Sequence, residues 1–154
     1  MRPEITFRHA TPADLPVLLS FEQGIVAAER PCNPLIKEGE IHYYDIAAMI
    51  ESEQVAVIVA EDEGELVASG YARIVESKPF KVHDQHAYLG FMYVRPSHRG
   101  QGLVAKIIEA LKAFARSRGL THCYLEVYHN NDPAVRAYEK AGFKKEVLLM
   151  RSGL

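Results

Sequence analysis

The chain has 154 residues, of which 48% are hydrophobic and 25% charged. This mixture is typical of one compact globular domain and excludes a disordered or collagen-like chain. The longest purely apolar run, residues 55–60, is far shorter than the roughly 20 residues needed to cross a bilayer. The first residues lack the apolar core of a secretion signal. We therefore expect a cytoplasmic protein with no membrane partner.

Charge is distributed unevenly along the chain, although the formal net charge is only −2. Residues 1–90 carry 7 Lys and Arg against 15 Asp and Glu, whereas residues 91–154 carry 11 against 5. The acidic part suits a cation and the basic part an anion, unless both are ordinary solvated surfaces. The sequence lacks a stripe of Arg and Lys with interleaved aromatic residues, so no nucleic-acid partner is expected. Cys32 and Cys123 show no CxxC spacing, so neither a disulfide framework nor a zinc site is expected.

The first half of the chain predicts a strand, two helices and a hairpin. Ile5 and Phe7 alternate with polar residues as in a strand, and Thr11-Pro12-Ala13-Asp14 has the pattern of a helix start. β-Branched residues flank a turn at residues 62–65, as in an antiparallel hairpin. In order, the predicted elements are a strand at residues 5–8, a helix over 12–28, a loop over 31–39, a short helix over 43–52 and strands over 55–60 and 66–76.

The second half alternates strands with amphipathic helices. Apolar residues at 104, 107, 108, 111, 114 and 115 share one helical face, and Gly119 is placed to end that helix. The predicted elements are a strand over 87–94, a helix from 104 to 118, a strand over 123–128, a helix over 133–141 and a strand over 143–150. The whole predicts a single α/β domain, residues 1–154, with a mixed, mostly antiparallel sheet of six or seven strands and helices on both faces.

The segment Tyr93 to Leu103 places glycines between a strand and the start of a helix. Glycine allows close approach to a ligand, and the unpaired amides of a first helical turn suit phosphate, although such a turn can also need glycine for its geometry alone. The segment is neither a Walker loop nor a dinucleotide fingerprint.

Arg99-Gly100-Gln101-Gly102-Leu103-Val104 resembles the acyl-CoA-binding motif [Q/R]xxGx[G/A] of the GNAT superfamily of N-acetyltransferases. The opening FRHATPADLPVL, Val94-x-Pro96 and the segment from Asn131 to Phe143 resemble further landmarks of that family in the same order. The resemblance spans residue 4 to about 150. It implies a GNAT-like fold, acetyl-CoA as co-substrate and transfer of an acetyl group to an amine.

The resemblance also implies the residues that bind the co-substrate. The pantetheine arm is expected to pair with the strand backbone of Met92, Tyr93 and Val94, and the pyrophosphate to meet the amides from Gly100 to Ala105. The implied binding residues of the loop and helices are Arg99, Gly100, Gln101, Gly102, Leu103, Val104, Ala105 and Asn131. Val104 departs from the Gly or Ala that the family favours at this position. Its branched side chain leaves less room for the pyrophosphate to approach the backbone. Asn131 is equally suited to capping the helix that follows.

By the same resemblance, Tyr138 is the general acid that protonates the departing thiolate, with an ordinary core aromatic as the alternative. The resemblance does not identify the general base, because Gly90 and Phe91 occupy the positions where many family members carry an acidic strand residue. Glu126 is one candidate, on the polar face of its strand with Tyr124 and Tyr128. Other candidates are Glu22, Glu29 and His86, and a water chain is a further alternative.

The function expected from this pattern is an N-acetyltransferase in which a primary amine of a cationic small molecule or peptide attacks acetyl-CoA directly in a ternary complex. The alternative is a non-catalytic acyl-CoA sensor on the same fold. His83 and His86 are three residues apart, but the sequence offers no third ligand, so no metal is expected. Several tyrosines are candidates to line the acceptor pocket, namely Tyr43, Tyr44, Tyr71, Tyr88 and Tyr93. A homodimer is an expectation from the family.

Overall fold

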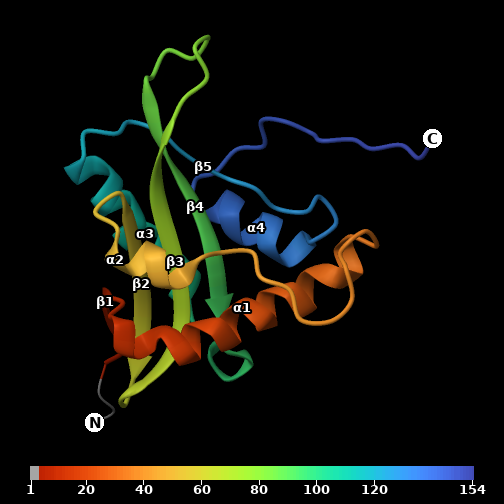
Figure 1. Cartoon of the computed structure of the whole chain (residues 1–154). Helices are drawn as coiled ribbons and strands as arrows, with labels where there is room; N and C mark the ends of the chain where they lie inside the picture. Colours follow the sequence, from red (N-terminus) through yellow and green to blue (C-terminus); the bar gives the residue numbers. More distant parts are fainter. Residues whose placement is uncertain (1–3) are drawn as a thin grey trace.

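The computed structural model describes residues 4–154 and has one sheet covered by helices (Figure 1). The strands are β1 (Thr6–His9), β2 (Val55–Asp62), β3 (Glu65–Glu76), β4 (Gln85–Val94) and β5 (Cys123–Leu125). The helices are α1 (Leu15–Glu29), α2 (Ile46–Glu51), α3 (Leu103–Ser117) and α4 (Asp132–Lys140). Short 3-10 turns occupy Pro12–Asp14, Arg30–Cys32 and Pro96–His98.

The sheet has the strand order β1-β2-β3-β4-β5, in which the first three pairings are antiparallel and only β4 and β5 are parallel. The mixed, mostly antiparallel α/β sheet with helices on both faces is therefore confirmed. One face packs against α3 and α4 through a cluster that includes Ile107, Ile108 and Leu111. The other face packs against α1 and α2 through Leu18 and Phe21. Alternate residues of each strand pack against the helices on opposite faces of the sheet. The central strands are therefore apolar on both faces.

The prediction of six or seven strands is wrong, because the described residues 4–154 form five. Residues 143–150 belong to no helix or strand within that part of the chain, and Val147, Leu148, Leu149 and Met150 are exposed. The strand predicted over 123–128 ends at Leu125. An apolar run gives a strand only where a neighbouring edge supplies hydrogen bonds, and neither segment has such a neighbour along its predicted length.

The helix predicted over 12–28 is confirmed as the turn Pro12–Asp14 followed by α1. Asp14 accepts a hydrogen bond from the Thr11 amide at 2.8 Å and two from the Arg8 guanidinium at 2.8 and 3.0 Å. The helix predicted over 43–52 is shorter, because the Asp45 side chain accepts from the Ala48 amide at 3.1 Å and caps the helix at Ile46. The predicted central helix is confirmed as α3.

Candidate functional site

A bulge in β4 opens the sheet where the co-substrate was predicted to bind. Ser69 pairs with Tyr93 while Tyr71 pairs with Gly90, so β4 has one residue more than β3 across this interval. Phe91 takes the extra position with φ +57°, and its carbonyl accepts a hydrogen bond from Ser69 Oγ at 2.9 Å. A non-glycine residue in this conformation is uncommon, and bulges often re-aim strands at functional sites.

Pairing between β4 and β5 stops beside this bulge. The last parallel partners are Leu89 and Leu125, so no described residue after Leu125 pairs with the β4 segment Gly90–Val94. The backbone of Met92, Tyr93 and Val94 therefore lies beyond the ladder, as the expected strand-like contact with a ligand requires.

The side chains of these three residues point away from that open edge. Tyr93 packs on Phe21 of α1 with ring centroids 4.7 Å apart, and a Cβ placed on Gly24 would lie 2.6 Å from its ring. Met92 and Val94 pack against the cluster beneath α3. The three side chains thus pack on the two helical layers, while the backbone of these residues runs along this edge.

The loop before α3 has the geometry expected of a phosphate site. Gly100 and Gly102 both have φ +77°, a conformation that glycine adopts without strain, and a Cβ on either would meet no described atom within 4 Å. Gly102 is the N-cap of α3 and provides no side chain to accept the first amides of the helix. Those amides and the positive end of the helix dipole are therefore presented to a ligand.

Val104 fits this site despite departing from the expected motif. Its side chain is partly buried against the core cluster of the α3 layer, so the branched group is directed toward the protein. The Val104 amide keeps its place in the first turn. Arg99 Nε donates to the Val94 carbonyl at 3.1 Å and so ties the loop to the end of β4.

A second contact that holds this loop in place was not predicted from the sequence. His98 Nε2 lies 2.7 Å from Asp62 Oδ2 at the end of β2, and both side chains are largely buried. Since 36 residues separate the two positions, no local sequence signal identifies the pair.

Tyr138 lies in α4, partly buried against the α3 layer, with its ring centroid 6.1 Å from that of Phe143. Burial, and secondarily the charge of Glu29, raises the pKa of Tyr138 to about 12. The phenol is therefore held in its protonated form, as a general acid requires. Both readings of Tyr138, as acid and as core aromatic, are compatible with this placement.

Glu29 is half-buried at the end of α1, and burial raises the pKa of its carboxyl. The negative charge of Glu29 in turn helps to raise the pKa of the Tyr43 hydroxyl. Two further hydrogen bonds join the turn after α1 to the segment before α4: Asn33 Nδ2 donates to Tyr128 Oη at 3.0 Å, and Asn130 Nδ2 to the Cys32 carbonyl at 3.4 Å. Among the base candidates, Glu29 is the one whose charge contributes to the raised pKa of Tyr138.

Glu126 is exposed just after β5 and belongs to a different group of side chains. Burial, together with the negative charge of Glu126, raises the pKa of Tyr88 to about 12. The Arg73 guanidinium lies 5.0 Å from the centroid of the Tyr88 ring and moderates the negative charge nearby.

The missing strand carboxylate has a packing explanation. A Cβ on Gly90 would lie 2.8 Å from both Cζ and Oη of Tyr71, so the Tyr71 ring crosses the space that a longer side chain would take. Tyr71 in turn makes edge contacts with Tyr44 at 5.5 Å between centroids, and Tyr44 with Phe91 at 5.4 Å. Aromatic rings thus line the α1 side of the β4 bulge.

Glu22 is fully buried and serves as an anchor for the segment before α2. Its Oε2 accepts hydrogen bonds from the amides of Tyr43 at 2.8 Å and Tyr44 at 2.9 Å, and its Oε1 lies 2.7 Å from His42 Nδ1. This hydrogen bond raises the pKa of His42. A carboxylate with both oxygens occupied in this way has a structural task and is a poor base.

The remaining predicted residues lie apart from this group or have local partners. His86 lies at the opposite end of β4 from Met92, where its Nδ1 is 2.8 Å from Ser77 Oγ; His83 Nδ1 is 2.6 Å from the same oxygen. Within residues 4–154, His, Cys, Asp and Glu side chains form no metal-binding group of three or more. Asn131 caps α4 by accepting from the Ala134 amide at 3.5 Å.

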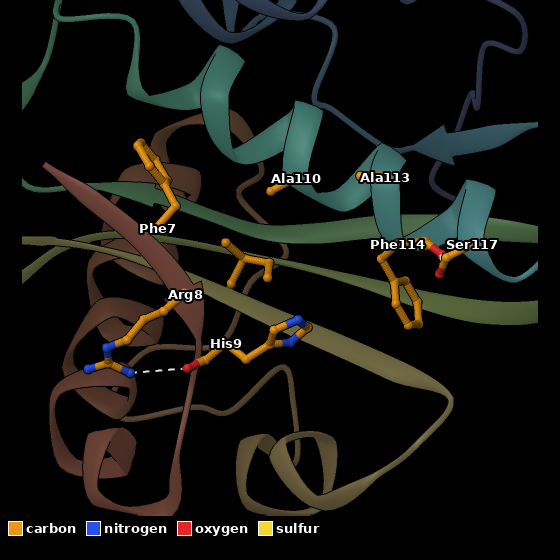
Figure 2. A pocket seen from close by; sticks show the side chains of 8 residues that line it. Phe7, Arg8, His9, Ala110, Ala113, Phe114 and Ser117 are labelled. Atoms are coloured by element: carbon orange, nitrogen blue, oxygen red, sulfur yellow. Dashed lines mark hydrogen bonds between the residues drawn. The ribbon is translucent and has the colours of Figure 1, made fainter.

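A hollow of about 430 Å³ lies elsewhere, between β1 and α3 (Figure 2). Figure 2 shows Phe7, Arg8 and His9 on one side of it and Ala110 and Phe114 of α3 on the other. It contains no residue predicted for the co-substrate or the chemistry. No helix in residues 4–154 has the length and hydropathy of a membrane span.

Comparisons with known proteins found a matching family and several relatives. A family model described as the acetyltransferase (GNAT) family matches residues 23–143. Streptothricin acetyltransferase of Streptomyces lavendulae is 29% identical over 125 residues, which is 78% of this chain and 63% of that protein. N-alpha-acetyltransferase 60 of Xenopus tropicalis is 30% identical over 66% of this chain and 43% of its own length. The chain thus spans less than two thirds of these curated relatives.

Solved structures share the fold. A variant of the BH1408 protein from Bacillus halodurans has a TM-score of 0.86 at 21% identity, covering 97% of this chain and 99% of that one. A predicted acetyltransferase from Clostridium acetobutylicum, solved with acetyl-CoA, has a TM-score of 0.74 at 19% identity, covering 97% and 96%.

Proposed function

Because the chain belongs to the acetyltransferase (GNAT) family, we propose that it transfers an acetyl group from acetyl-CoA to a primary amine. The observation that carries the proposal is the adjacency of two features. The β4 backbone is released from β5 after Leu89, and the uncapped start of α3 follows β4 through a loop with glycines at 100 and 102. Together they suit an extended arm that ends in a pyrophosphate.

In this proposal the backbone of Met92, Tyr93 and Val94 pairs with the pantetheine arm. The amides from Gly100 to Ala105, including those of Gln101, Leu103 and Val104, bind the pyrophosphate, with Arg99 adding positive charge. The side-chain oxygen of Asn131 caps α4, so its amide nitrogen is the atom that donates to the arm. Bound acetyl-CoA supplies an activated thioester; the protein residues orient it and move protons.

Glu29 and Tyr138 are assigned the two proton transfers. The amine attacks the thioester carbonyl, the carbon–sulfur bond breaks, Tyr138 gives its proton to the thiolate and Glu29 accepts the proton lost by the amine. The raised pKa values of Glu29 and of Tyr138 favour these roles, since the carboxyl is a stronger base than usual and the phenol stays protonated. Glu126, whose charge helps to raise the pKa of Tyr88, is the second candidate base.

The acceptor is proposed to be cationic. Glu29 and Glu126 supply negative charge beside Tyr43 and Tyr88, and aromatic rings bind ammonium groups by cation–π attraction. The similarity to streptothricin acetyltransferase points the same way, because the name of that relative identifies a small-molecule acceptor. An amino-sugar or polyamine amine is the class to test first.

The test is release of free CoA thiol from acetyl-CoA in the presence of cationic amines. We expect thiol release that depends on the amine and that falls by about 10²–10⁴-fold in kcat for Tyr138→Phe, with the affinity for acetyl-CoA retained. Tyr124→Phe is the matched control, since Tyr124 hydrogen-bonds His83 at the far end of the sheet. Full turnover by Tyr138→Phe would remove Tyr138 from the chemistry. Binding of acetyl-CoA with no transfer to any amine would favour the sensor alternative, which the absent carboxylate at Gly90 supports.

A further inference from the structure

One face of the sheet has a group of positive charges at the end away from the bulge. Arg73, Tyr88 and Tyr124 are register partners across β3, β4 and β5, so their side chains point to the same face. It is the face that packs against α1 and α2, since Tyr88 contacts the cluster of that layer. The paired ends of β3 and β4 extend past both helices (Figure 1), and Arg73 is exposed. This end of the face is therefore open to a ligand.

Two cations stand over the two tyrosine rings of this row. Arg73 Cζ lies 5.0 Å from the centroid of the Tyr88 ring, and Lys81 Nζ lies 5.5 Å from the centroid of the Tyr124 ring. Within residues 4–154, Arg73 forms no ion pair and Lys81 forms one, with the exposed carboxylate of Glu146 at 3.7 Å. An aromatic face attracts a cation but does not neutralise it. Most of the positive charge here is therefore left for a ligand to balance.

Ser77 restricts the hydrogen bonding of a third basic group, His86. Ser77 Oγ lies 2.8 Å from His86 Nδ1 and 2.6 Å from His83 Nδ1. A hydroxyl group has one proton, so it can donate to only one of these nitrogens, and the other nitrogen must donate to the hydroxyl oxygen. The His86 ring also packs edge-on against the Tyr124 ring, with centroids 4.7 Å apart. His86 thus lies beside the ring over which Lys81 stands.

The charges around His86 decide between the two arrangements. Burial, followed by the positive charges of His83, Lys81 and Arg73, lowers the pKa of His86. His86 is therefore neutral at physiological pH, and its Nδ1 accepts the Ser77 proton. The proton of the neutral ring is then on Nε2, which has no hydrogen-bond partner within residues 4–154. This N–H group is a donor that a ligand can use.

Carboxylates lie at the borders of this cluster. Glu76 points to the opposite face of the sheet, because an odd number of positions separates it from Arg73 in β3. Glu126 follows Tyr124 by two residues, toward the bulge, and its charge acts on Tyr88. The positive end of this face thus adjoins the acidic part that is proposed to hold the acceptor amine.

We propose that Arg73, Lys81 and His86 form a binding site for a phosphate group. Arg73 presents a fork of N–H donors from β3, the Lys81 ammonium approaches from the loop between β3 and β4, and His86 Nε2–H adds a donor from β4. A phosphate monoester has three terminal oxygens and nearly two negative charges at neutral pH, so it can use all three groups. A carboxylate has one charge and two oxygens, and it would leave one of the cations unpaired.

The first experiment measures binding and needs no turnover. The imidazole signals of the full chain are followed by NMR while inorganic phosphate replaces chloride at constant pH and ionic strength. We expect a saturable shift of the His86 signal with a dissociation constant on the order of 1 mM, and binding of acetate that is at least about tenfold weaker. A shift that does not saturate, or equal affinities for phosphate and acetate, overturns the proposal.

Variants that remove one charge locate the site. Arg73→Gln and Lys81→Gln should each weaken phosphate binding by at least about tenfold, because a hydrogen bond between charged groups is lost. Lys78→Gln is the matched control, since Lys78 is exposed in the same loop and lies over neither tyrosine ring. Its phosphate affinity should stay within about twofold of wild type. Equal weakening in all three variants, with their backbone amide spectra intact, would show diffuse attraction and overturn the site.

The second experiment identifies the source of the phosphate, and it rests on the proposed acetyl transfer. Thiol release is measured with inorganic phosphate as the probe. A phosphate group carried by the acceptor predicts that phosphate raises KM for the amine with kcat unchanged, and that Arg73→Gln removes this effect. Free phosphate as the ligand predicts an unchanged KM for the amine. Absence of turnover with intact phosphate binding would contradict the acetyl transfer and not the phosphate site.

Discussion

Replacing Glu22 distinguishes an anchor from a base. Glu22 is fully buried, with Oε2 accepting the Tyr43 and Tyr44 amides and Oε1 beside His42. In Glu22→Leu both amides lose their acceptor, and each buried donor left unpaired costs about 1–3 kcal/mol. The free energy of unfolding should therefore fall by about 2–6 kcal/mol, and KM for the amine should rise as the two tyrosines shift.

Glu22→Gln is the matched variant, because it keeps the shape and removes the charge. The amide oxygen can accept both backbone amides, and the amide nitrogen can donate to neutral His42. Stability should remain within about 1.5 kcal/mol of wild type, and kcat should be nearly unchanged. Urea unfolding gives the stability, and steady-state thiol release gives kcat and KM for amine and acetyl-CoA separately.

The pH dependence of the same variant provides a second readout. Glu22 raises the pKa of His42, so the stability from this pair is fully present below the ordinary histidine pKa and is lost as pH rises through the raised value. Glu22→Gln should remove this loss. If instead Glu22→Gln kept its stability and amine KM but lost about 100-fold or more in kcat, Glu22 would be acting as the base and the anchor role would be refuted.

Three further results are expected. Glu29→Gln should lower kcat/KM for cationic amines by at least about tenfold while sparing acetyl-CoA affinity; Glu126→Gln is the paired measurement, and a larger effect there would move the base to Glu126. Gly90→Ala should cost about 1–3 kcal/mol by overpacking, since its Cβ would lie 2.8 Å from the Tyr71 ring; additive behaviour with Tyr71→Ala in unfolding would contradict this contact. Arg8 lowers the pKa of Asp14, so the stability it gives is present above the ordinary Asp pKa and is lost as pH falls through the lowered value; Asp14→Asn should lack that loss in acid unfolding.

Local sequence patterns predicted the features that nearby residues determine, namely α3, the loop before it and the start of the first helix. The apolar spacing of Ile107, Ile108 and Leu111 identified α3 and its buried face, and the two glycines before it marked the loop correctly. The helix start at Thr11 to Asp14 was also predictable, because these two residues have the three-residue spacing of a capping box.

Features that depend on contacts between distant residues were not predictable. At the bulge, Phe91 adopts a left-handed conformation and its carbonyl accepts a hydrogen bond from Ser69. The sequence around residue 91 contains no signal that predicts this conformation. β5 ends at Leu125, whose partner Leu89 lies next to this bulge. Glu29 of α1 influences the pKa of Tyr138 of α4 across the fold, so periodicity could not select Glu29 from the other carboxylates.

The most direct test of the proposed co-substrate site is calorimetric titration of acetyl-CoA into Gly102→Glu and Gly102→Gln. Both variants carry the same strain at φ +77°, so their difference isolates the effect of one negative charge at the start of α3. Repulsion between that charge and the pyrophosphate is worth about 1–3 kcal/mol at about 5 Å in surroundings between water and protein surface. We predict that the wild type binds and that the Glu variant binds roughly 5–150-fold more weakly than the Gln variant. Equal affinities in the two variants, or no binding by the wild type, would contradict the site.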